Sequence, residues 1–551
     1  MKLTGAEILI RCLKEQGVDT IFGYPGGTVL DIYDALYRDG TLRHVLTAHE
    51  QGAAHAADGY ARATGKTGVC LATSGPGATN LVTGIATAYM DSVPLVAITG
   101  NVTVANLGRD SFQEVDIAGI TMPITKHNYI VKDVKELADT IREAFYIAGS
   151  GRKGPVLIDI PKNLQTELCE YEEKAPAAYV PKGVSADKLT EVAQAIAKSR
   201  RPLIIAGGGC IRADASANLL AFAKKIQAPV CSTLMGLGSY PASDEQFLGL
   251  VGMHGTDAAA KSFRRADTII ACGMRFSDRV AGDRVKFRAG KTIIQFDIDT
   301  AEIDKNVPTD LSVMADVNEI LKTLVPLLEQ ADRKEWLKEV TAYRDYEAGN
   351  FDSTLPAYKI LSALGGFTDA DTPVATDVGQ HQMWTAQYCK FEKPRTFLSS
   401  GGLGTMGYGM GAAIGACIGT GRKTVLVTGD GCFHMNLNEM STAVKEGLPL
   451  VILLMNNSVL GMVRQWQTLF YGKRYSQTML DKNTDFVKLA EAFGAKGMTI
   501  AGEKDVLPVL TAAFKEADNG PVLVDCKIGM DDKVLPMIAP GKSFDDIMTK
   551  V

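Results

Sequence analysis

The segment from Val427 to Asn457 constrains the fold of this chain more than any other. A short apolar run, Thr424 to Thr428, leads into it and is predicted to be a buried strand. A Gly-Asp-Gly turn, a helix from about Asn436 to Glu446 and a second apolar strand, Leu450 to Met455, follow. Strand, glycine turn, helix and strand make one βαβ unit of a parallel sheet, so the segment predicts an α/β fold.

This unit places Asp430 at the carboxyl end of one strand and Asn457 just beyond the carboxyl end of the next. Ligands of open α/β sheets bind at that edge. A carboxylate oxygen and an amide oxygen suit a hard divalent cation such as Mg²⁺, and the glycines let backbone N–H groups approach a diphosphate. The Gly-Asp-Gly tripeptide alone would indicate only a turn. Together with the closing Asn-Asn it indicates a metal and diphosphate site.

Composition excludes several classes of protein. At 551 residues, with 46% hydrophobic residues, the chain has enough apolar sequence for about three domains. A net charge of −5 and the absence of a long basic run argue against a nucleic-acid partner. Ten cysteines without a CxxC pair indicate neither a zinc site nor a disulfide framework, and they favour a reducing cytoplasm. No segment has the apolar length that spans a membrane.

The alternation of helices, apolar strands and glycine turns predicts three doubly wound parallel-sheet domains. We place them at residues 1–180, 184–345 and 356–551, with a charged and proline-rich linker at Glu170–Gly183. MKLTGAEILIRCLKEQGV predicts an N-terminal amphipathic helix that leads directly into a strand, not a signal peptide. Strands are predicted at Thr20–Phe22, Val69–Thr73, Leu95–Thr99, Val156–Ile160, Pro202–Ala206, Thr268–Ala271 and Lys291–Asp297.

A repeat relates the first and third of these domains. Thr73–Asn101 and Thr428–Asn457 both show a glycine turn, a helix of similar length and a Pro-Leu-Val sequence that opens an apolar strand. Any two βαβ units share part of this pattern. The alternative, which we favour, is that the first and third domains are two copies of one fold.

Motifs over essentially the whole chain resemble one enzyme family. The Val427–Asn457 segment resembles the thiamine-diphosphate motif of thiamine-dependent enzymes. The further motifs are similar to those of the acetohydroxyacid synthase (acetolactate synthase) catalytic subunits: GYPGG (23–27), HEQGA (49–53), TSGPGATN (73–80), SFQE (111–114), GMHG (252–255), RFSDRVAG (275–282), GMVRQWQ (461–467) and PMIAPG (536–541).

The resemblance implies a reaction between two 2-ketoacids. Pyruvate would be decarboxylated on thiamine diphosphate, and the hydroxyethyl carbanion would add to pyruvate or 2-ketobutyrate. The products would be 2-acetolactate or 2-aceto-2-hydroxybutyrate, in the first common step of branched-chain amino-acid biosynthesis. An FAD-dependent pyruvate oxidase and a flavin-free catabolic acetolactate synthase are the alternatives within the fold. A non-catalytic nucleotide-binding or scaffold protein is the alternative outside it.

The resemblance also implies roles for individual residues. Glu50 would be the catalytic acid at N1′ of the aminopyrimidine, and Arg279 would bind the acceptor carboxylate through its planar guanidinium. Gly27, Phe112, Gln113, Met253 and Trp466 would complete the catalytic set. Asp430, Asn457 and the backbone carbonyl of Val459 would hold Mg²⁺, and Met406 would sit between the two cofactor rings.

The remaining implied residues bind cofactors. Those for thiamine diphosphate, besides Met406, are Gly26, Pro76, Asn80, Val378, Gly379, Gln380, His381, Gly404, Gly429, Gly431, Cys432, Leu460, Gly461 and Met462. Those for FAD are Gly207, Gly208, Gly209, Thr233, Leu234, Met253, His254, Gly255, Gly273, Arg275, Asp278, Val280, Asp297, Ile298 and Asp316. The FAD would be structural, because the reaction has no net redox step.

The resemblance finally implies an assembly. Family members place the cofactor between the first domain of one chain and the third domain of its partner, so we expect a homodimer or homotetramer. A separate regulatory small subunit fits the family as well. We expect small-molecule 2-ketoacids as the substrates of a cytoplasmic enzyme, with no nucleic-acid or membrane partner.

Overall fold

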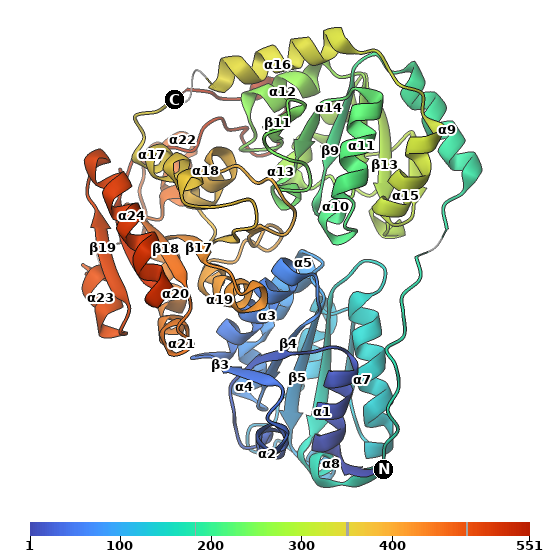
Figure 1. Cartoon of the computed structure of the whole chain (residues 1–551), viewed down its shortest axis with the longest axis vertical. Coiled ribbons are helices and arrows are strands. Elements are labelled where there is room, and N and C mark those ends of the chain that lie inside the picture. Colours follow the sequence, from blue (N-terminus) through green and yellow to red (C-terminus); the bar gives the residue numbers. More distant parts are fainter. Residues whose placement is uncertain (182, 349–351, 481–482, 551) are drawn as a thin grey trace.

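Three six-stranded parallel sheets, each packed with helices, make up the chain (Figure 1). The computed structural model describes residues 1–181, 183–348, 352–480 and 483–550. In Figure 1 the first sheet lies at the bottom in blue, the central one at the top in green and yellow, and the third at the side in orange and red. The predicted α/β class with three parallel sheets is confirmed.

The first sheet carries the N-terminal part of the chain. Its strands, in spatial order, are β3 (Arg43–Leu46), β2 (Thr20–Gly23), β4 (Gly68–Ala72), β5 (Leu95–Asn101), β7 (Pro155–Pro161) and β6 (His127–Ile130). Its helices are α1 (Gly5–Glu15), α2 (Leu30–Asp39), α3 (Glu50–Thr64), α4 (Pro76–Asn80), α5 (Val82–Met90), α6 (Ile117–Thr121), α7 (Val134–Gly149) and α8 (Lys162–Thr166). β4, β5 and β7 are buried along their whole length, as parallel strands covered on both faces are.

A short pairing at the chain start was not predicted. β1 (Lys2–Thr4) precedes α1 and pairs antiparallel with β8 (Leu168–Glu170), at the beginning of the predicted linker. The predicted N-terminal helix therefore begins only at Gly5, where Thr4 caps it by accepting a hydrogen bond from the Glu7 N–H. Strands of three residues at an edge depend on tertiary contacts, so local sequence carries little signal for them.

The third sheet repeats the topology of the first. Its strands, in spatial order, are β16 (Phe397–Leu398), β15 (Val374–Thr376), β17 (Thr424–Gly429), β18 (Leu450–Asn456), β20 (Val522–Lys527) and β19 (Lys496–Ile500). Its helices are α17 (Pro356–Ala363), α18 (Gln380–Tyr388), α19 (Tyr408–Thr420), α20 (Asp430–Asn436), α21 (Met440–Lys445), α22 (Gly461–Phe470), α23 (Phe486–Ala492) and α24 (Val506–Glu516). Both sheets follow the same order of strands along the chain, so the predicted relation between the first and third domains is confirmed.

The Gly-Asp-Gly segment is not the turn that we predicted. β17 ends at Gly429, whose extended backbone passes directly into α20 at Asp430. The predicted helix from Asn436 to Glu446 was also wrong in its start, because α20 already ends at Asn436, where a 3₁₀ turn leads into α21. The Asn436 side chain donates a hydrogen bond to the Gly407 carbonyl, 2.9 Å away, which holds this break in place.

The central sheet has a different strand order. Its strands, in spatial order, are β11 (Phe247–Leu250), β10 (Val230–Ser232), β9 (Pro202–Ala206), β12 (Thr268–Cys272), β13 (Thr292–Asp297) and β14 (Leu311–Met314). Its helices are α9 (Ala186–Lys198), α10 (Gly208–Arg212), α11 (Ser216–Ile226), α12 (Asp257–Arg265), α13 (Asp278–Ala281), α14 (Arg284–Arg288), α15 (Val317–Leu324) and α16 (Lys334–Ala348). Counted along the chain this order is 3-2-1-4-5-6, which is that of dinucleotide-binding sheets.

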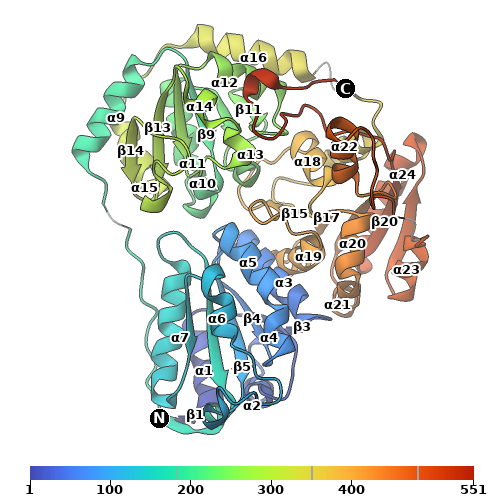
Figure 2. The ribbon, with the colours of Figure 1, turned by 180° about the vertical axis from the view of Figure 1, so that it is seen from behind.

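The C-terminal segment returns to the central domain. The Ile538 N–H donates to the Met253 carbonyl at 2.7 Å, and the Phe544 ring stacks on Phe263 with centroids 4.2 Å apart. Figure 2 shows this red segment beside α16 and β11. The residues at the end of the predicted third domain, 356–551, thus help to close the core of the second.

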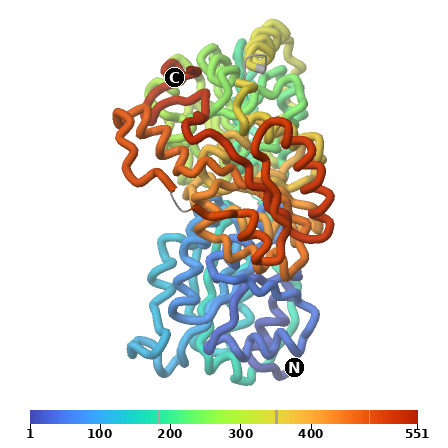
Figure 3. Tube along the Cα trace, turned by 90° about the vertical axis from the view of Figure 1, so that its left-hand side faces the viewer, coloured from blue at the N-terminus to red at the C-terminus, as the bar shows by residue number. Residues whose placement is uncertain are grey.

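Two helices rich in alanine and glycine join the first and third domains. α3 packs along α19, and their small residues let the two backbones approach closely. A Cβ atom at Gly415 would lie only 1.8 Å from the Ala56 carbonyl oxygen, and one at Gly59 only 2.2 Å from that of Ala412. Figure 3 shows the orange third domain resting on the blue first domain. This contact fixes how the two domains sit in one chain.

We expect Gly415→Val to destabilise the protein. The new side chain would meet the backbone of Ala56, so α3 and α19 must separate, and overpacking of this kind typically costs about 1–3 kcal/mol. Urea unfolding followed by circular dichroism measures the change. Gly149→Val is the control, because Gly149 is also helical but its Cβ would meet nothing within 4 Å. Equal losses in both variants would contradict the close-packing account.

Two further sequence expectations concern thiols and membranes. All ten cysteines are free in the structure, and most of them are buried. In the part of the chain that the structure describes, no helix combines the length and the apolar character needed to cross a membrane.

Candidate active site

Each of the three large sheets has one point where the strand order reverses, and ligands of open α/β sheets bind at such points. The reversal lies between β2 and β4 in the first sheet, between β9 and β12 in the central sheet and between β15 and β17 in the third. Predicted site residues follow these strands in all three sheets: Gly26, Gly27 and Pro76; Gly207, Gly208, Gly209, Gly273 and Arg275; Val378, Gly379, Gly429 and Asp430. The topology therefore supports three ligand-binding edges.

In the first domain, Glu50 is the first residue of α3. The Asn80 amide donates a hydrogen bond to one Glu50 carboxylate oxygen at 3.0 Å. Glu439 of the third domain accepts the backbone N–H groups of Ala48 and His49 at 3.1 and 3.0 Å. The third domain of the same chain thus fixes the backbone just before Glu50.

Two further predicted regions of the first domain, around Pro76 and around Gln113, pack against each other, and Phe112 beside them faces the solvent. Gly75, which precedes Pro76, packs against Gln113, so that a Cβ at Gly75 would lie 2.8 Å from the Gln113 carbonyl oxygen. Gln113 has a left-handed backbone with φ of 59°, and its neighbour Phe112 is 88% exposed. A large apolar side chain held this far in the open is a surface that a second molecule can cover.

In the third domain, the predicted metal ligands meet at the edge formed by β17 and β18, which pair in register at Gly429 and Met455. Burial raises the pKa of Asp430 to about 6, and the backbone N–H groups of Gly431 and Ser458 oppose that shift. No ion pair involving Asp430 is found in the described part of the chain. A buried carboxylate without a cationic partner fits a divalent cation at this place.

Asn457 is held at the same edge. Its side-chain amide donates to Gln380 at 3.3 Å, and its oxygen accepts the Val459 N–H at 3.2 Å. Gly461, at the start of α22, packs against Gln380, with a Cβ position only 2.0 Å from the Gln380 side-chain oxygen. The predicted set of Asp430, Asn457 and Val459 is therefore brought together.

The glycines at this edge let other predicted cofactor-binding residues pack directly against the backbone. A Cβ at Gly429 would lie 3.0 Å from His381 Nδ1, and one at Gly431 would lie 2.9 Å from Leu460 and 3.7 Å from Met406. His381 Nε2 is buried without a hydrogen-bond partner. The Cys432 thiol donates to the Val378 carbonyl at 3.2 Å. These contacts suit a diphosphate that takes its hydrogen bonds from backbone and imidazole donors.

A cavity of about 1280 Å³ lies between the central and third domains, and a few residues of the first domain line it as well. The predicted residues that line it are Gly208, Gly209, Thr233, Leu234, Met253, His254, Gly273, Arg275, Asp278, Arg279, Val280, Asp297, Ile298, Asp316, Val378, Gly379, Gly404, Met406, Met462 and Trp466. The Met253 N–H donates to the Arg279 carbonyl at 2.7 Å, and the Arg279 guanidinium lies 6.0 Å from the Trp466 ring. Three predicted catalytic residues, from two domains, thus face one cavity.

The predicted flavin residues form the central wall of this cavity. Gly209 and Gly273 touch backbone to backbone, since a Cβ on either would lie 2.7 Å from the other's Cα. His254 Nε2 is buried without a partner, and burial raises the pKa of Asp297 to about 6. Gly207 and Gly255 do not line the cavity but pack against Gly273 and Leu250. A cradle of glycines with unused polar donors fits a dinucleotide.

The predicted site residues of the first domain do not line this cavity. Among the lining residues that the structure describes, none of Gly26, Gly27, Glu50, Pro76, Asn80, Phe112 and Gln113 appears. The predicted site residues that line the cavity thus all belong to the central and third domains. Asp430 and Asn457 do not line it either, although Met406, which does, lies next to Gly431.

Sequence reasoning missed two residues that the structure places at the cavity. Arg152 of the first domain lines it and forms ion pairs with Asp299 and Glu302 at 2.9 and 2.7 Å. Asp91 also lines it and accepts the backbone N–H groups of Gly401 and Gly402 at 2.9 and 2.8 Å. Nothing local in the sequence distinguishes either from a surface charge, because the groups that tie them to the cavity come from other domains.

Asp91 orients the glycine-rich loop that carries Met406, so we expect Asp91→Asn to lower turnover. An amide cannot accept both N–H groups as a carboxylate does, and misplacement of a site loop costs roughly ten- to a hundredfold. The kcat and the KM for thiamine diphosphate measure the effect. Asp518→Asn, at an exposed carboxylate, is the control. Unchanged kinetics in a folded Asp91→Asn protein would show that this contact does not position the loop.

Most of the chain matches models of one enzyme class. Residues 3–120 match the N-terminal TPP binding domain of thiamine pyrophosphate enzymes, residues 189–324 the central domain and residues 377–526 the C-terminal TPP binding domain. Each of these ranges falls within a different one of the three domains.

Characterised relatives cover nearly the full length. The chain is 46% identical to an acetolactate synthase of Mycobacterium bovis, over 99% of this chain and 91% of that protein. It is 46% identical to the acetolactate synthase large subunit of Corynebacterium glutamicum, over 99% and 90%. It is 42% identical to that of Haemophilus influenzae, over 99% and 98%.

Proposed function

Because this chain belongs to the thiamine pyrophosphate enzymes and, among them, to the family of acetolactate synthase large subunits, we propose that it is an acetolactate synthase. It decarboxylates pyruvate and joins the remaining two-carbon unit to the carbonyl carbon of a second 2-ketoacid. With pyruvate as acceptor the product is 2-acetolactate, and with 2-ketobutyrate it is 2-aceto-2-hydroxybutyrate.

The position of Arg279 carries this proposal. An enzyme that joins two 2-ketoacids must bind the carboxylate group that the acceptor retains in the product. A guanidinium can bind a carboxylate through two parallel hydrogen bonds. Arg279 lines the cavity beside Trp466 and Met253, with its side chain 57% exposed and only a 3.4 Å ion pair to Asp278. The cation is thus available, while the indole and the thioether supply an apolar wall for the acceptor's alkyl group.

Thiamine diphosphate, when bound, supplies a carbanion at C2 that attacks the ketone of a 2-ketoacid. Asp430, Asn457 and the Val459 carbonyl would hold the Mg²⁺ that anchors its diphosphate, with Gly429, Gly431 and His381 around the phosphate oxygens. Glu50 would hold the proton at N1′ of the pyrimidine, and Met406 would pack between the rings. The buried Asp430 carboxylate, which has no cationic partner among the described residues, and the free nitrogen of His381 support this placement.

We place the complete site between two copies of the chain. Glu50 and its neighbours are absent from the cavity that Arg279 and Met406 line, and Phe112 beside them is 88% exposed. A homodimer with two-fold symmetry would bring the Glu50 group of each protomer to the cavity of its partner, and two such dimers would form a tetramer. The relatives' description as large subunits supports a separate small subunit as a further partner.

A structural FAD fits the central domain. The 3-2-1-4-5-6 strand order, the Gly209–Gly273 contact and the buried free nitrogen of His254 support a dinucleotide there. This favours the flavin-containing biosynthetic synthase over the flavin-free catabolic type. Ten free thiols suit the reducing cytoplasm, where we place the reaction.

We expect Arg279→Ala to impair the second half of the reaction more than the first. Loss of a charged hydrogen-bond partner costs roughly 1.5–3 kcal/mol, which is about ten- to a hundredfold in acetolactate formation. Carbon dioxide release from carboxyl-labelled pyruvate, compared with acetolactate yield, measures the split. Arg288→Ala removes an exposed arginine paired with Asp310 and serves as the control.

Equal losses of decarboxylation and ligation in Arg279→Ala would remove this residue from the acceptor site. A pyruvate oxidase would instead consume oxygen with pyruvate, so rapid pyruvate-dependent oxygen uptake with no acetolactate would overturn the proposal and favour the oxidase.

A further inference from the structure

A small second cavity lies where the three domains meet. Its volume is about 30 Å³, and four of its lining residues are cationic: Arg62 and Lys153 of the first domain, Arg212 of the central domain and Arg395 of the third. The other lining residues that the structure describes include no carboxylate. Like charges from three domains thus converge on one small cavity.

Arg62 has an unused donor there. It forms ion pairs with Asp58 at 2.5 Å and Asp91 at 3.0 Å, and its side chain is only 6% exposed. These contacts occupy Nε and Nη2, whereas Nη1 is buried without a hydrogen-bond partner. A buried guanidinium nitrogen normally has an acceptor, so a missing acceptor is expected at this place.

Arg212 and Lys153 are held by uncharged groups. Arg212 donates to the carbonyl oxygens of Ser92 and Gly208 at 2.7 and 3.0 Å, and Lys153 donates to the Arg212 carbonyl at 3.2 Å. Burial and the charge of Arg62 lower the pKa of Arg212 to about 10, and burial and the charge of Arg395 lower that of Lys153. Burial and the neighbouring positive charges thus disfavour the charged forms of both side chains.

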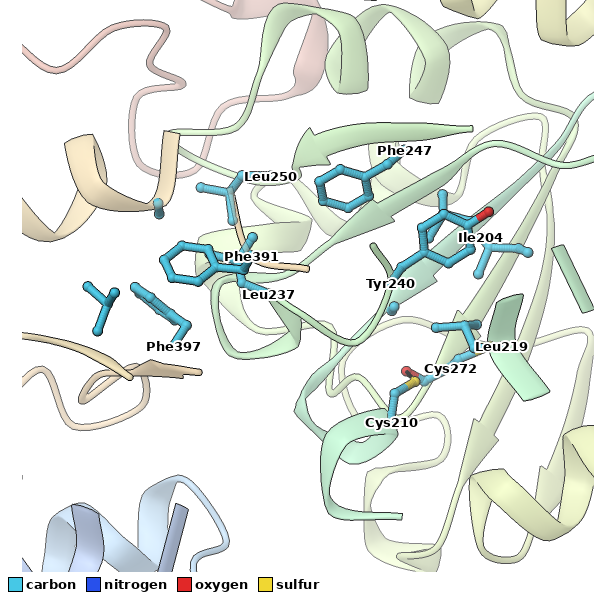
Figure 4. Packing of buried hydrophobic residues seen from close by; sticks show 14 of the residues in the cluster. Ile204, Cys210, Leu219, Leu237, Tyr240, Phe247, Leu250, Cys272, Phe391 and Phe397 are labelled. Carbon is cyan, nitrogen blue, oxygen red and sulfur yellow. Dashed lines mark hydrogen bonds between the residues drawn. The ribbon is translucent and has the colours of Figure 1, made fainter. Parts of the chain in front are cut away.

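Arg395 is held in a costly conformation beside them. It is a non-glycine residue with φ of 67°, and its guanidinium lies so close to Gly65 that a Cβ there would be 2.9 Å from Cζ. It pairs with Asp214 at 2.8 Å. Such backbone strain persists where the surroundings over-determine the residue. Figure 4 shows Phe397, which lines this cavity, beside Phe391, with Leu237 close by, so the cavity has an apolar wall close to the cations.

We propose that this cavity binds a small inorganic anion of the size of chloride. One buried water needs roughly 10–15 Å³, so the cavity has room for one or two atoms of that size and not for a nucleotide phosphate. The anion accepts hydrogen bonds from cations of all three domains. Because Arg62 also holds Asp91, which orients the Gly401–Gly402 backbone, the anion supports the frame of the large cavity.

The site is distinct from the large cavity. Lys153, Arg212 and Met235 line both spaces, whereas Arg62 and Arg395 line only the small one. The tests therefore use the enzyme with thiamine diphosphate, Mg²⁺ and FAD present, so that these ligands fill their own sites. None of them depends on the proposed reaction.

Bromide is the direct probe. Crystals of the loaded enzyme, grown without chloride and soaked in sodium bromide, should give an anomalous-scattering peak within hydrogen-bond distance of Arg62 Nη1. Peaks confined to the protein surface would mean an adventitious ion only and would overturn the proposal, as would a water molecule in the cavity.

A solution test gives a second readout. At constant ionic strength, replacing gluconate with chloride should raise the thermal midpoint in a saturable manner, as a ligand of the folded state does. Arg395→Gln should raise the chloride concentration needed for half-saturation at least about tenfold, as expected when a charged partner of the anion is lost. Arg422→Gln, at an exposed arginine paired with Asp369, is the control.

Arg395→Lys, which keeps the charge, should restore part of the chloride response if Arg395→Gln folds poorly. A linear response to salt, or the same half-saturation in all four proteins, would refute the anion site.

Discussion

Replacing Glu50 with glutamine is expected to lower acetolactate formation by roughly 10²- to 10⁴-fold, the usual contribution of a general acid or base. Glutamine keeps the size of the side chain and a hydrogen bond with Asn80, which lies 3.0 Å from the carboxylate. It cannot exchange a proton with N1′ of the pyrimidine. The loss should therefore appear in kcat and in the exchange of the cofactor's C2 proton, with the fold unchanged.

Glu136→Gln is the matched control, because Glu136 is an exposed acid in the first turn of α7, as Glu50 is an acid at the start of α3. It should retain full activity. Wild-type proton exchange in Glu50→Gln would contradict the assigned role, whereas loss of circular-dichroism signal would point to a structural effect.

Two inactive variants are expected to restore activity when their subunits exchange. Glu50→Gln damages the first-domain group, and Asp430→Ala removes the buried carboxylate from the third-domain group. In a mixed dimer one site receives both defects and the other receives none. With equal amounts and random exchange, half of the dimers are mixed and carry one intact site, so about a quarter of the wild-type activity should return.

The mixing experiment requires proof of exchange, for which two differently tagged variants are pulled down together. As a control, Glu50→Gln mixed with wild type should show no activity beyond that of its wild-type chains. If exchange is complete and activity stays absent, Glu50 and Asp430 serve the same chain's site, and the shared-site account is wrong.

Short apolar runs that end in turn residues were enough to predict the three sheets. Strands such as Leu95–Asn101 and Leu450–Asn456 are buried along their length, so their sequences are continuously apolar and end at glycine or asparagine. The repeat between Thr73–Asn101 and Thr428–Asn457 predicted the relation of the first and third domains. Two sheets with the same strand order have their glycine turns, helices and apolar strands at similar spacings in the sequence.

Features that depend on distant partners were not predictable in this way. β1 forms only because β8 lies beside it, and the break at Asn436 depends on the Gly407 carbonyl. Asp91 and Arg152 look like surface charges in the sequence, and the contacts that bring them to the cavity are made with Gly401 and Asp299 of other domains. The C-terminal segment follows a third-domain strand but packs on the central core, which its own sequence does not indicate.

The roles of individual residues were predicted from the resemblance to the enzyme family. The structure adds which of these residues lie close together. Arg279, Met253 and Trp466 are far apart in the chain, yet the structure brings them to one cavity. Gly207 and Gly255 show the reverse case, since they serve the packing of the cradle and do not face the cavity.

Product analysis tests the central claim most directly. The purified chain, with thiamine diphosphate, Mg²⁺, FAD and pyruvate as the only substrate, should form 2-acetolactate and release one carbon dioxide for every two pyruvate molecules consumed, without oxygen uptake. Adding 2-ketobutyrate should divert part of the product to 2-aceto-2-hydroxybutyrate. Release of one carbon dioxide per pyruvate, with acetaldehyde or an oxidised acetyl product in place of acetolactate, would contradict the account.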